Sequence, residues 1–278
     1  MRFFHISLGV IAVAIAAPAM AQEETAPTPT FTFTGNVTAI SDYRFRGLTQ
    51  TNEDPAVQAT VNINHKSGLY AGVWTSTIDG GRDGSTPALT GYGGAEVDLY
   101  GGFTRTLKGG LGFDVGLLYY YYPGGVKTLN TDFFEPYASV NYTIGPVNAK
   151  VGAAYAWGGQ SGLDFTSGSD DNIYAYGELA AGIPTTPLTL KGHLGYTKGS
   201  LGLVNFVGSD DSYFDWSATA EAAIGHVKVG VSYIDTDISS ATGTFTKGSR
   251  TGSVRRFDRF DQFYGRGSTV LGYVGLTF

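Results

Sequence analysis

Residues 57–64 read VQATVNIN, and apolar and polar side chains alternate at every position of this stretch. Successive side chains of a β-strand point to opposite faces, so a period of two predicts a strand with one apolar and one polar face. The same alternation runs through residues 31–46. It returns in ten further segments, which begin near residues 68, 94, 110, 133, 147, 171, 188, 213, 227 and 268. The sequence therefore predicts an all-β protein with twelve strands.

Short and long connections alternate between the predicted strands. Five are short turns, at residues 65–67, 105–109, 145–146, 184–187 and 225–226. Six are long and polar, at residues 47–54, 79–93, 123–131, 158–169, 198–212 and 236–267. An even number of strands, with short turns at one end and long loops at the other, is typical of an outer-membrane barrel. We therefore expect a 12-stranded antiparallel transmembrane up-and-down β-barrel with both chain ends on the short-turn, periplasmic side.

The composition excludes several other classes of protein. The 278 residues include no cysteine, so neither a disulfide framework nor a thiolate metal site can form. A formal net charge of −6 argues against a general nucleic-acid-binding protein. Charged residues make up 15% of the chain, below the ~25% usual in soluble domains. After residue 21 no run approaches the ~18 consecutive apolar residues of a membrane-spanning helix, which excludes a helical membrane protein.

The first 21 residues have the features of a secretory signal peptide. Arg2 precedes an apolar run at residues 6–17, and Ala19-Met20-Ala21 has the small-x-small form of a cleavage site. The alternative is a membrane anchor or a core helix, but the run is shorter than the ~20 residues that a spanning helix needs. We expect residues 1–21 to be the signal peptide, residues 22–30 a short periplasmic leader, and residues 31–278 the barrel, in the outer membrane of a Gram-negative bacterium.

Aromatic residues mark the edges of the predicted apolar band. Phe33 and Tyr43 lie ten residues apart on the predicted outer face, which corresponds to about 23 Å along the membrane normal at ~45° tilt. A barrel is expected to have an apolar band ~25 Å tall, edged by aromatic girdles. More aromatic residues fall on this face near the long-loop ends of their strands: Tyr119, Tyr121, Tyr155, Trp157, Tyr196, Phe214, Trp216 and Tyr233. In a soluble sandwich, the alternative fold, core aromatics would concentrate in the middle of the strands.

The chain ends on an aromatic residue. Val270, Gly272, Val274, Leu276 and Phe278 continue the apolar alternation to the last position. Such an ending resembles the signal that the outer-membrane barrel assembly machinery recognises. We therefore expect Phe278 to act as an assembly signal.

Three stretches of the chain resemble the TorF-type porins of proteobacteria. They are SDYRFRGLTQ at residues 41–50 with PAVQ at residues 55–58, YGGAEVDLYGG at residues 92–102, and LGYVGL at residues 271–276. The resemblance covers essentially the whole chain after the predicted signal peptide. It implies an outer-membrane β-barrel that acts as a porin, and it supplies neither a solute nor catalytic residues.

The polar face of the predicted strands carries charges that we expect to line a pore. Asp42, Arg44 and Arg46 lie two residues apart on the first predicted strand, just below the outer loops, and would form part of a charged ring that sets ion selectivity. The alternative is a network of salt bridges that fills a narrow barrel. The predicted pore-lining residues have a net charge of −3, which favours cations weakly: Asp42, Arg44, Arg46, Glu96, Asp98, Asp114, Glu135, Lys150, Glu178, Lys191, Asp215, Glu221 and Lys228.

The number of strands predicts the width of the bore. Eight strands leave room only for side chains, and 16 to 18 strands leave an aqueous channel. Twelve strands should therefore enclose a narrow or partly blocked pore, with a small conductance.

The last predicted loop carries a basic cluster. Between residues 247 and 266, six basic and two acidic residues give a net charge of +4. The basic residues are Lys247, Arg250, Arg255, Arg256, Arg259 and Arg266. Folded inward, the loop would form a constriction that attracts anions. Folded outward, its guanidinium groups would suit lipopolysaccharide phosphates, and we favour this second arrangement.

The sequence predicts neither an enzyme nor a metal site. His65 and His226 fall in predicted turns, and His193 is the one histidine expected to face the lumen. A catalytic nucleophile needs a base within hydrogen-bonding reach. The Gly-Ser-Asp-Asp sequences at residues 168–171 and 208–211 lack the spacing of a calcium-binding loop. We therefore expect no cofactor and no metal.

Two functions follow from these patterns. We expect a porin that gives small polar or ionic solutes passive diffusion through a narrow lumen. The alternative is a non-conducting structural or adhesive barrel that acts through its long extracellular loops. In both cases the expected partners are outer-membrane lipid, lipopolysaccharide and the barrel assembly machinery, and nucleic acid is not among them.

Overall fold

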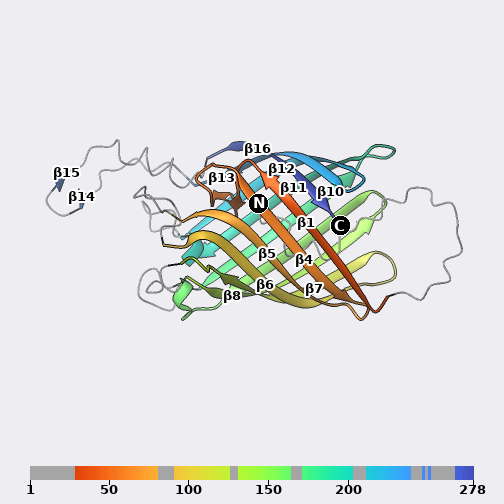
Figure 1. The fold of residues 1–278 in the computed structure, drawn as a ribbon, viewed down its shortest axis with the longest axis horizontal. Coiled ribbons are helices and arrows are strands. Elements are labelled where there is room, and N and C mark those ends of the chain that lie inside the picture. The colour runs from red at the N-terminus through yellow and green to blue at the C-terminus, as the bar shows by residue number, and fades with distance from the viewer. Residues whose placement is uncertain are drawn as a thin grey trace, which may run out of the picture.

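The computed structural model describes residues 29–80, 91–125, 131–163, 171–202, 211–238, 246–247, 250–251 and 267–278. Twelve strands within these ranges form one closed antiparallel barrel, and they run obliquely around it (Figure 1). In chain order they are β1 (Phe31–Ile40), β4 (Ala56–His65), β5 (Leu69–Gly80), β6 (Gly93–Thr106), β7 (Leu111–Tyr121), β8 (Phe133–Ile144), β9 (Val147–Ala156), β10 (Asn172–Gly182), β11 (Leu188–Gly199), β12 (Ser212–Ile224), β13 (Val227–Thr236) and β16 (Thr269–Thr277). The predicted 12-stranded antiparallel barrel is confirmed.

The first and last strands of the barrel close the sheet. β1 pairs along its whole length with β4, and residues 36–40 of the same strand pair with residues 273–277 of β16. Beyond that register, the backbone groups of Gly35 and Phe278 exchange two hydrogen bonds of 2.9 and 3.0 Å. Because every barrel strand has a partner on both sides, the barrel presents no unpaired sheet edge.

Within the described ranges, four short strands and two short helices lie in the connections. β2 (Arg44–Phe45) pairs with β3 (Leu48–Thr49), and β14 (Thr246–Lys247) pairs with β15 (Arg250–Thr251). The 3-10 helices η2 (Ser161–Leu163) and η3 (Ser200–Gly202) follow β9 and β11. In the part of the chain that the structure describes, no helix is both long and apolar enough to span a membrane.

Apolar side chains cover the outside of the barrel and polar side chains fill the inside. In β9, Val151 is 64% exposed, whereas the preceding Lys150 is buried. β4 repeats the pattern, with Val61 exposed and Asn62 buried. A soluble protein buries its large aliphatic residues, so an apolar outer surface of this extent is suited to hydrocarbon.

Aromatic residues gather on the outer face near the long loops, as predicted. The Tyr119 ring stacks on Phe134 with centroids 4.5 Å apart, and Phe134 stacks on Trp157 at 6.0 Å. Among the other predicted members, the rings with the greatest exposure are Tyr121, Tyr155, Phe214 and Tyr233. An amphipathic ring is stable at a boundary between hydrocarbon and water, so these residues are well placed for an interface.

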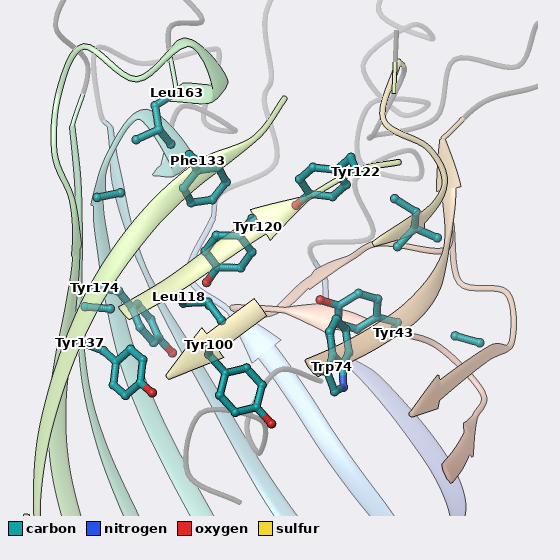
Figure 2. Close-up of a cluster of buried hydrophobic side chains, with 14 of the residues drawn as sticks. Tyr43, Trp74, Tyr100, Leu118, Tyr120, Tyr122, Phe133, Tyr137, Leu163 and Tyr174 are labelled. Atoms are coloured by element: carbon teal, nitrogen blue, oxygen red, sulfur yellow. The ribbon is translucent and has the colours of Figure 1, made fainter. Parts of the chain in front are cut away.

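The first strand of the barrel is shorter than predicted. β1 ends at Ile40, and the chain then turns into the bore instead of continuing along the wall. Tyr43, which we expected at the outer edge of the apolar band, is 0% exposed and lies inside (Figure 2). The prediction for Tyr43 is therefore wrong, together with the band height that depended on it. The alternating pattern did not reveal the break because β2 and β3 have the same period of two as β1.

Candidate functional site

The connection between β1 and β4 forms a two-residue hairpin inside the barrel. Arg44 pairs with Thr49 and Phe45 pairs with Leu48, which leaves Arg46 and Gly47 at the turn. Their φ angles are +49° and +83°. Positive φ at both central residues is the requirement of a type I′ turn, whose twist suits a two-residue hairpin. Glycine adopts such an angle readily, but an arginine does so only where its surroundings hold it.

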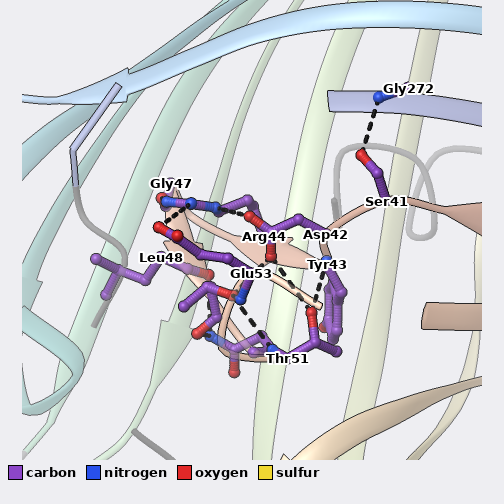
Figure 3. A network of polar contacts seen from close by, with 11 residues as sticks. Ser41, Asp42, Tyr43, Arg44, Gly47, Leu48, Thr51, Glu53 and Gly272 are labelled. Carbon is purple, nitrogen blue, oxygen red and sulfur yellow. Dashed lines mark hydrogen bonds and ion pairs between the residues drawn. The ribbon is translucent and has the colours of Figure 1, made fainter. Parts of the chain in front are cut away.

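Asp42 ties the two arms of this hairpin together (Figure 3). Its carboxylate accepts hydrogen bonds from Arg44 Nε at 2.5 Å and from Thr49 Oγ1 at 2.6 Å. The Arg44 guanidinium also donates to the Gly47 carbonyl oxygen at 3.2 Å and to Glu53 Oε1 at 3.3 Å. Because these bonds join residues of the same connection, they make the hairpin a self-contained unit.

The arms of the hairpin pack against strands β5 to β7. Tyr43 Oη donates to Glu96 Oε2 on β6 at 3.1 Å, and the Tyr43 ring meets the Trp74 ring of β5 edge-on, with centroids 5.3 Å apart. The Phe45 ring lies 6.3 Å from the Tyr120 ring of β7, also edge-on. Figure 2 shows Tyr43, Trp74 and Tyr120 gathered inside the barrel.

The tip of the hairpin reaches β8, β10 and β12. Arg46 Nη2 donates to both carboxylate oxygens of Glu135 on β8, at 2.7 and 2.9 Å. The guanidinium carbon lies 4.2 Å from the centroid of the Tyr174 ring on β10. Tyr213 Oη on β12 donates to the Arg46 carbonyl oxygen at 3.0 Å. With β5 to β7 on one side and β8 to β12 on the other, the hairpin crosses the bore.

A ladder of alternating charges lies on the inner face of strands β9 to β13. Lys191 Nζ is 2.8 Å from Glu221 Oε1, and Lys150 Nζ is 3.8 Å from Glu178 Oε2. Lys228 on β13 continues the alternation of positive and negative side chains from one strand to the next. The side chains of Glu178 and Lys191 remain 22% and 20% exposed. The ladder therefore has more access to water than the hairpin, whose Arg46 side chain is 4% exposed.

The facing part of the wall is rich in tyrosine. Tyr70 Oη donates to Asp114 Oδ1 at 2.6 Å and shares a second hydrogen bond of 2.6 Å with Tyr137 Oη. Tyr100 Oη donates to Asn62 Oδ1 at 2.5 Å. The inner surface thus carries both tyrosine hydroxyl groups and charged side chains.

His193 belongs to a polar network of the wall. Its imidazole nitrogens lie 3.5 Å from Glu178 and 3.2 Å from Asp215, and Tyr174 Oη is 2.8 Å from Nε2. Tyr174 is also the ring on which Arg46 stacks, so the network continues to the tip of the hairpin. Within the described ranges, no group of three or more histidine or carboxylate side chains is arranged to hold a metal ion.

The structure divides the predicted pore-lining residues into two groups. Those on barrel strands share the inward, polar face: Glu96, Asp98, Asp114, Glu135, Lys150, Glu178, Lys191, Asp215, Glu221 and Lys228. Asp42, Arg44 and Arg46 are not on the first strand, so that part of the prediction is wrong; they belong to the turn and hairpin that follow Ile40. The hairpin itself was not predicted. The available signal was the Arg46-Gly47 dipeptide between alternating segments, since glycine is favoured as the second turn residue of a two-residue hairpin.

The basic cluster of the last loop falls largely outside the described residues. Lys247 and Arg250 lie opposite one another in the short pair β14–β15. The other members fall outside the described ranges: Arg255, Arg256, Arg259 and Arg266.

The barrel is similar to solved structures of outer-membrane channels. The NanC porin matches with a TM-score of 0.54 and 11% identity over 88% of this chain and 98% of that chain. The KdgM porin matches with a TM-score of 0.52 and 6% identity over 88% and 99% of the two chains. The COG4313 outer membrane channel from Pseudomonas putida F1 gives 0.51 and 10% identity over 92% and 98%. These likenesses place the protein in the class of barrels that have a porin-type fold.

The chain belongs to the family described as "Bacterial protein of unknown function (Gcw_chp)", whose sequence profile matches residues 23–258. Comparison with curated proteins gives no match.

Proposed function

We propose that the protein is an outer-membrane porin through which small polar or ionic solutes diffuse passively along a narrow lumen. The observation that carries the proposal is the distribution of side chains on a closed sheet, apolar outside and polar inside. Hydrocarbon accepts only structures whose backbone polar groups are bonded internally, a condition that a closed barrel meets. The charged and hydroxylated inner surface provides the polar lining that ions and small hydrophilic solutes require.

Similar proteins support the same function. Two of the similar solved structures are porins and a third is an outer-membrane channel. One structure of the KdgM porin is a complex with disordered oligogalacturonate, which makes this neighbour a precedent for solute binding. The resemblance of residues 41–50 to the TorF-type porins favours the same assignment. We propose no enzymatic activity, in line with the expectation from the sequence, in which His193 is the one histidine predicted to face the lumen.

The proposal extends to targeting and orientation. Residues 1–21 act as the signal peptide of a Gram-negative secretory protein, and residues 22–30 remain as a periplasmic leader. Phe278 is recognised by the barrel assembly machinery. The long loops face outward, where the basic cluster of residues 247–266 contacts lipopolysaccharide phosphates.

The inward charges give the proposed channel a weak preference for cations. Eight acidic and five basic residues make up the predicted lining, counting Asp42, Arg44 and Arg46 of the hairpin. Most of them are paired with one another, so the residual field of the −3 balance is modest. We therefore expect selectivity by size to exceed selectivity by charge.

Electrical recording from a planar bilayer tests the function. Residues 22–278 are refolded in detergent and added to the bilayer. Folding is verified separately by the shifted electrophoretic mobility of the unheated barrel, and insertion by co-flotation with lipid vesicles. We expect discrete, small current steps in KCl, and a reversal potential in a KCl gradient that indicates a slight preference for K⁺ over Cl⁻. Protein that inserts but passes neither ions nor small sugars would contradict the porin function.

A non-conducting structural or adhesive barrel is the second candidate. The observation that favours it is the hairpin that crosses the bore from β5 to β12. The two functions differ in what happens when this hairpin is removed. A porin should conduct more when the hairpin is removed. A structural barrel should conduct neither with the hairpin nor without it.

A further inference from the structure

We propose that residues 41–54, which we call the plug, close the channel in the state seen here, and that the Arg46–Glu135 ion pair is the latch that holds the plug across the bore. The plug leaves the bore when the channel opens. This inference rests on the proposed porin function and identifies its gate.

The plug crosses the bore at the long-loop end of the barrel. Its arms contact β5, β6 and β7, and its tip contacts β8, β10 and β12. A side chain at Gly47 would also touch Thr236 on β13. The largest fully buried side chains of the described residues include Arg44 and Tyr43 of the plug, with Trp74 and Tyr120 from the wall. Buried side chains of the plug and of the wall therefore meet across the bore at this level, which is the arrangement expected of a closed channel.

The plug is built to move as one piece. The bonds of Asp42 to Arg44 and Thr49 lie within the connection and do not depend on the wall. Its ends are exposed at Ser41 and at residues 52–55, where the chain can change direction without disturbing the packed interior. The Ser41 backbone and side chain are anchored to Gly272 of β16 by bonds of 2.9 and 3.0 Å, which gives the plug a fixed point of attachment.

The Arg46–Glu135 pair is the strongest single attachment of the tip to the wall. It is buried, and one guanidinium nitrogen serves both carboxylate oxygens. Charge-assisted hydrogen bonds of this kind are roughly twice as strong as neutral ones. The tip has two further attachments to the wall: the Tyr213 hydrogen bond and the stacking on Tyr174.

The closed position also carries an internal cost. Arg46 Nη1 is buried without a hydrogen-bond partner among the described residues. An unsatisfied buried donor raises the free energy of the closed state relative to a state in which Arg46 meets water, so the ion pair with Glu135 holds the plug reversibly.

A reversible disulfide between the plug and the wall tests whether the plug must move. The Cβ position of Gly47 lies against the Thr236 side chain, so a Gly47→Cys/Thr236→Cys pair brings the two Cβ atoms near the ~3.8 Å typical of a disulfide. The natural chain has no cysteine, and the variant therefore contains only these two thiols. Oxidised and reduced forms of one refolded protein are compared, so any strain caused by a side chain at position 47, where φ is positive, is common to both.

We expect oxidation to abolish most of the current, because a covalent bond between the tip of the plug and β13 keeps the plug in the bore. Reduction should restore the current. The Gly47→Cys and Thr236→Cys single variants serve as controls and should not respond to oxidant. Equal currents in the oxidised and reduced double variant would show that the plug does not gate the channel, and would leave the proposed porin function intact.

Deletion of the plug tests the proposed gate and the proposed porin function independently of each other. Replacing residues 42–54 by a short glycine-serine link should give a larger and steadier conductance than the wild type. Replacement of the exposed turn residues 184–187 by the same link is the control for altering a connection at the other end of the barrel and should leave the conductance as it was. If the plug deletion inserts and stays silent, the porin function fails. If the deletion variant conducts with the wild-type current, the proposed gate is wrong and the porin function stands.

Substitutions at the latch test its role. Glu135→Gln keeps the size of the side chain and removes its charge, so the fraction of time in the open state should rise by about tenfold, the effect of losing one charge-assisted bond. Asp171→Asn is the matched control. Its carboxylate accepts from Tyr155 on the outer face at 2.9 Å, away from the plug, and its gating should be that of the wild type.

Charge reversal distinguishes a latch from a general loss of packing. Arg46→Glu places two carboxylates together and should open the channel further than Glu135→Gln. The Arg46→Glu/Glu135→Arg double variant restores an ion pair, and its open fraction should return toward the wild-type value. A double variant as open as Arg46→Glu alone, or a Glu135→Gln channel that gates like the wild type, would overturn the latch.

Discussion

Tyr176 and Gly152 lie opposite one another on β10 and β9, and the ring of the tyrosine rests over the glycine. A Cβ added at Gly152 would be 2.5 Å from the Tyr176 Cζ. Tyr100 and Gly72 form the same arrangement on β6 and β5. An inward ring needs a neighbour without a side chain if it is to lie flat against a curved wall. Tyrosine and glycine together therefore line the bore without filling its centre.

Gly152→Ala should destabilise the folded barrel by about 1–3 kcal/mol, the usual cost of forcing an extra methyl group into a packed site. Urea unfolding in lipid vesicles, followed by tryptophan fluorescence, measures the change. Gly192→Ala on the outer face is the control, because its added Cβ would meet no atom within 4 Å. A Gly152→Ala barrel as stable as the control would show that the Tyr176 ring moves aside at no cost.

At the scale of a single element, β9 shows how one strand meets two environments. Val151 points outward and Lys150 points inward, although they are adjacent in the chain. The Lys150 ammonium is within 3.8 Å of Glu178 and stands 5.3 Å from the Tyr176 ring. The strand therefore presents an aliphatic side to hydrocarbon and a charged side to the bore, which is the arrangement that a period of two allows.

Val151→Arg should cost about 2–4 kcal/mol of stability, the penalty for a cation on the lipid face near the bilayer midplane. Val151 is near the middle of β9, whereas Ile224 is the last residue of β12, next to a short turn. Ile224→Arg should therefore cost only about 0–1 kcal/mol, as expected near the interface. Unfolding titrations of both variants in the same vesicles provide the comparison. Equal costs would argue against a membrane that surrounds the middle of the barrel.

At the scale of the whole molecule, closure joins residues from the two ends of the barrel. Gly35 and Phe278 exchange backbone hydrogen bonds, and the Phe278 ring lies beside Gly35. The ring is nevertheless 68% exposed. Since backbone groups supply the pairing, the side chain of the last residue contributes little to the closed barrel and remains accessible to another protein.

Phe278→Ala should therefore lower the amount of folded protein in the outer membrane of cells several-fold, while purified protein refolds in detergent with nearly the wild-type yield. The proposed recognition by the assembly machinery would use the ring, whereas strand pairing uses only the backbone groups of Phe278. Ile224→Ala, an exposed apolar residue at the same end of the barrel, is the control and should assemble normally. Equal losses in cells and in detergent would assign Phe278 a structural role instead.

The number of barrel strands, the limits of all but the first and the order of short and long connections followed from the sequence. Each depends on local chemistry: a period of two marks a strand, and clusters of glycine, proline and polar residues mark its ends. The prediction that segments start near residues 68, 94 and 110 differs by one residue from the observed starts of β5, β6 and β7. The inward face of the charged strand residues followed from the same period.

The path of residues 41–46 was decided by the tertiary structure alone. Alternation is the same whether these residues extend β1 along the wall or fold into the bore as β2 and β3. The choice depends on partners far along the chain: Glu135 is 89 residues from Arg46, and Tyr213 is 167 residues from it. A buried arginine requires a carboxylate, and only the closed barrel brings that carboxylate to it. Local pattern thus determined the wall of this protein, and contacts across the bore determined what stands inside it.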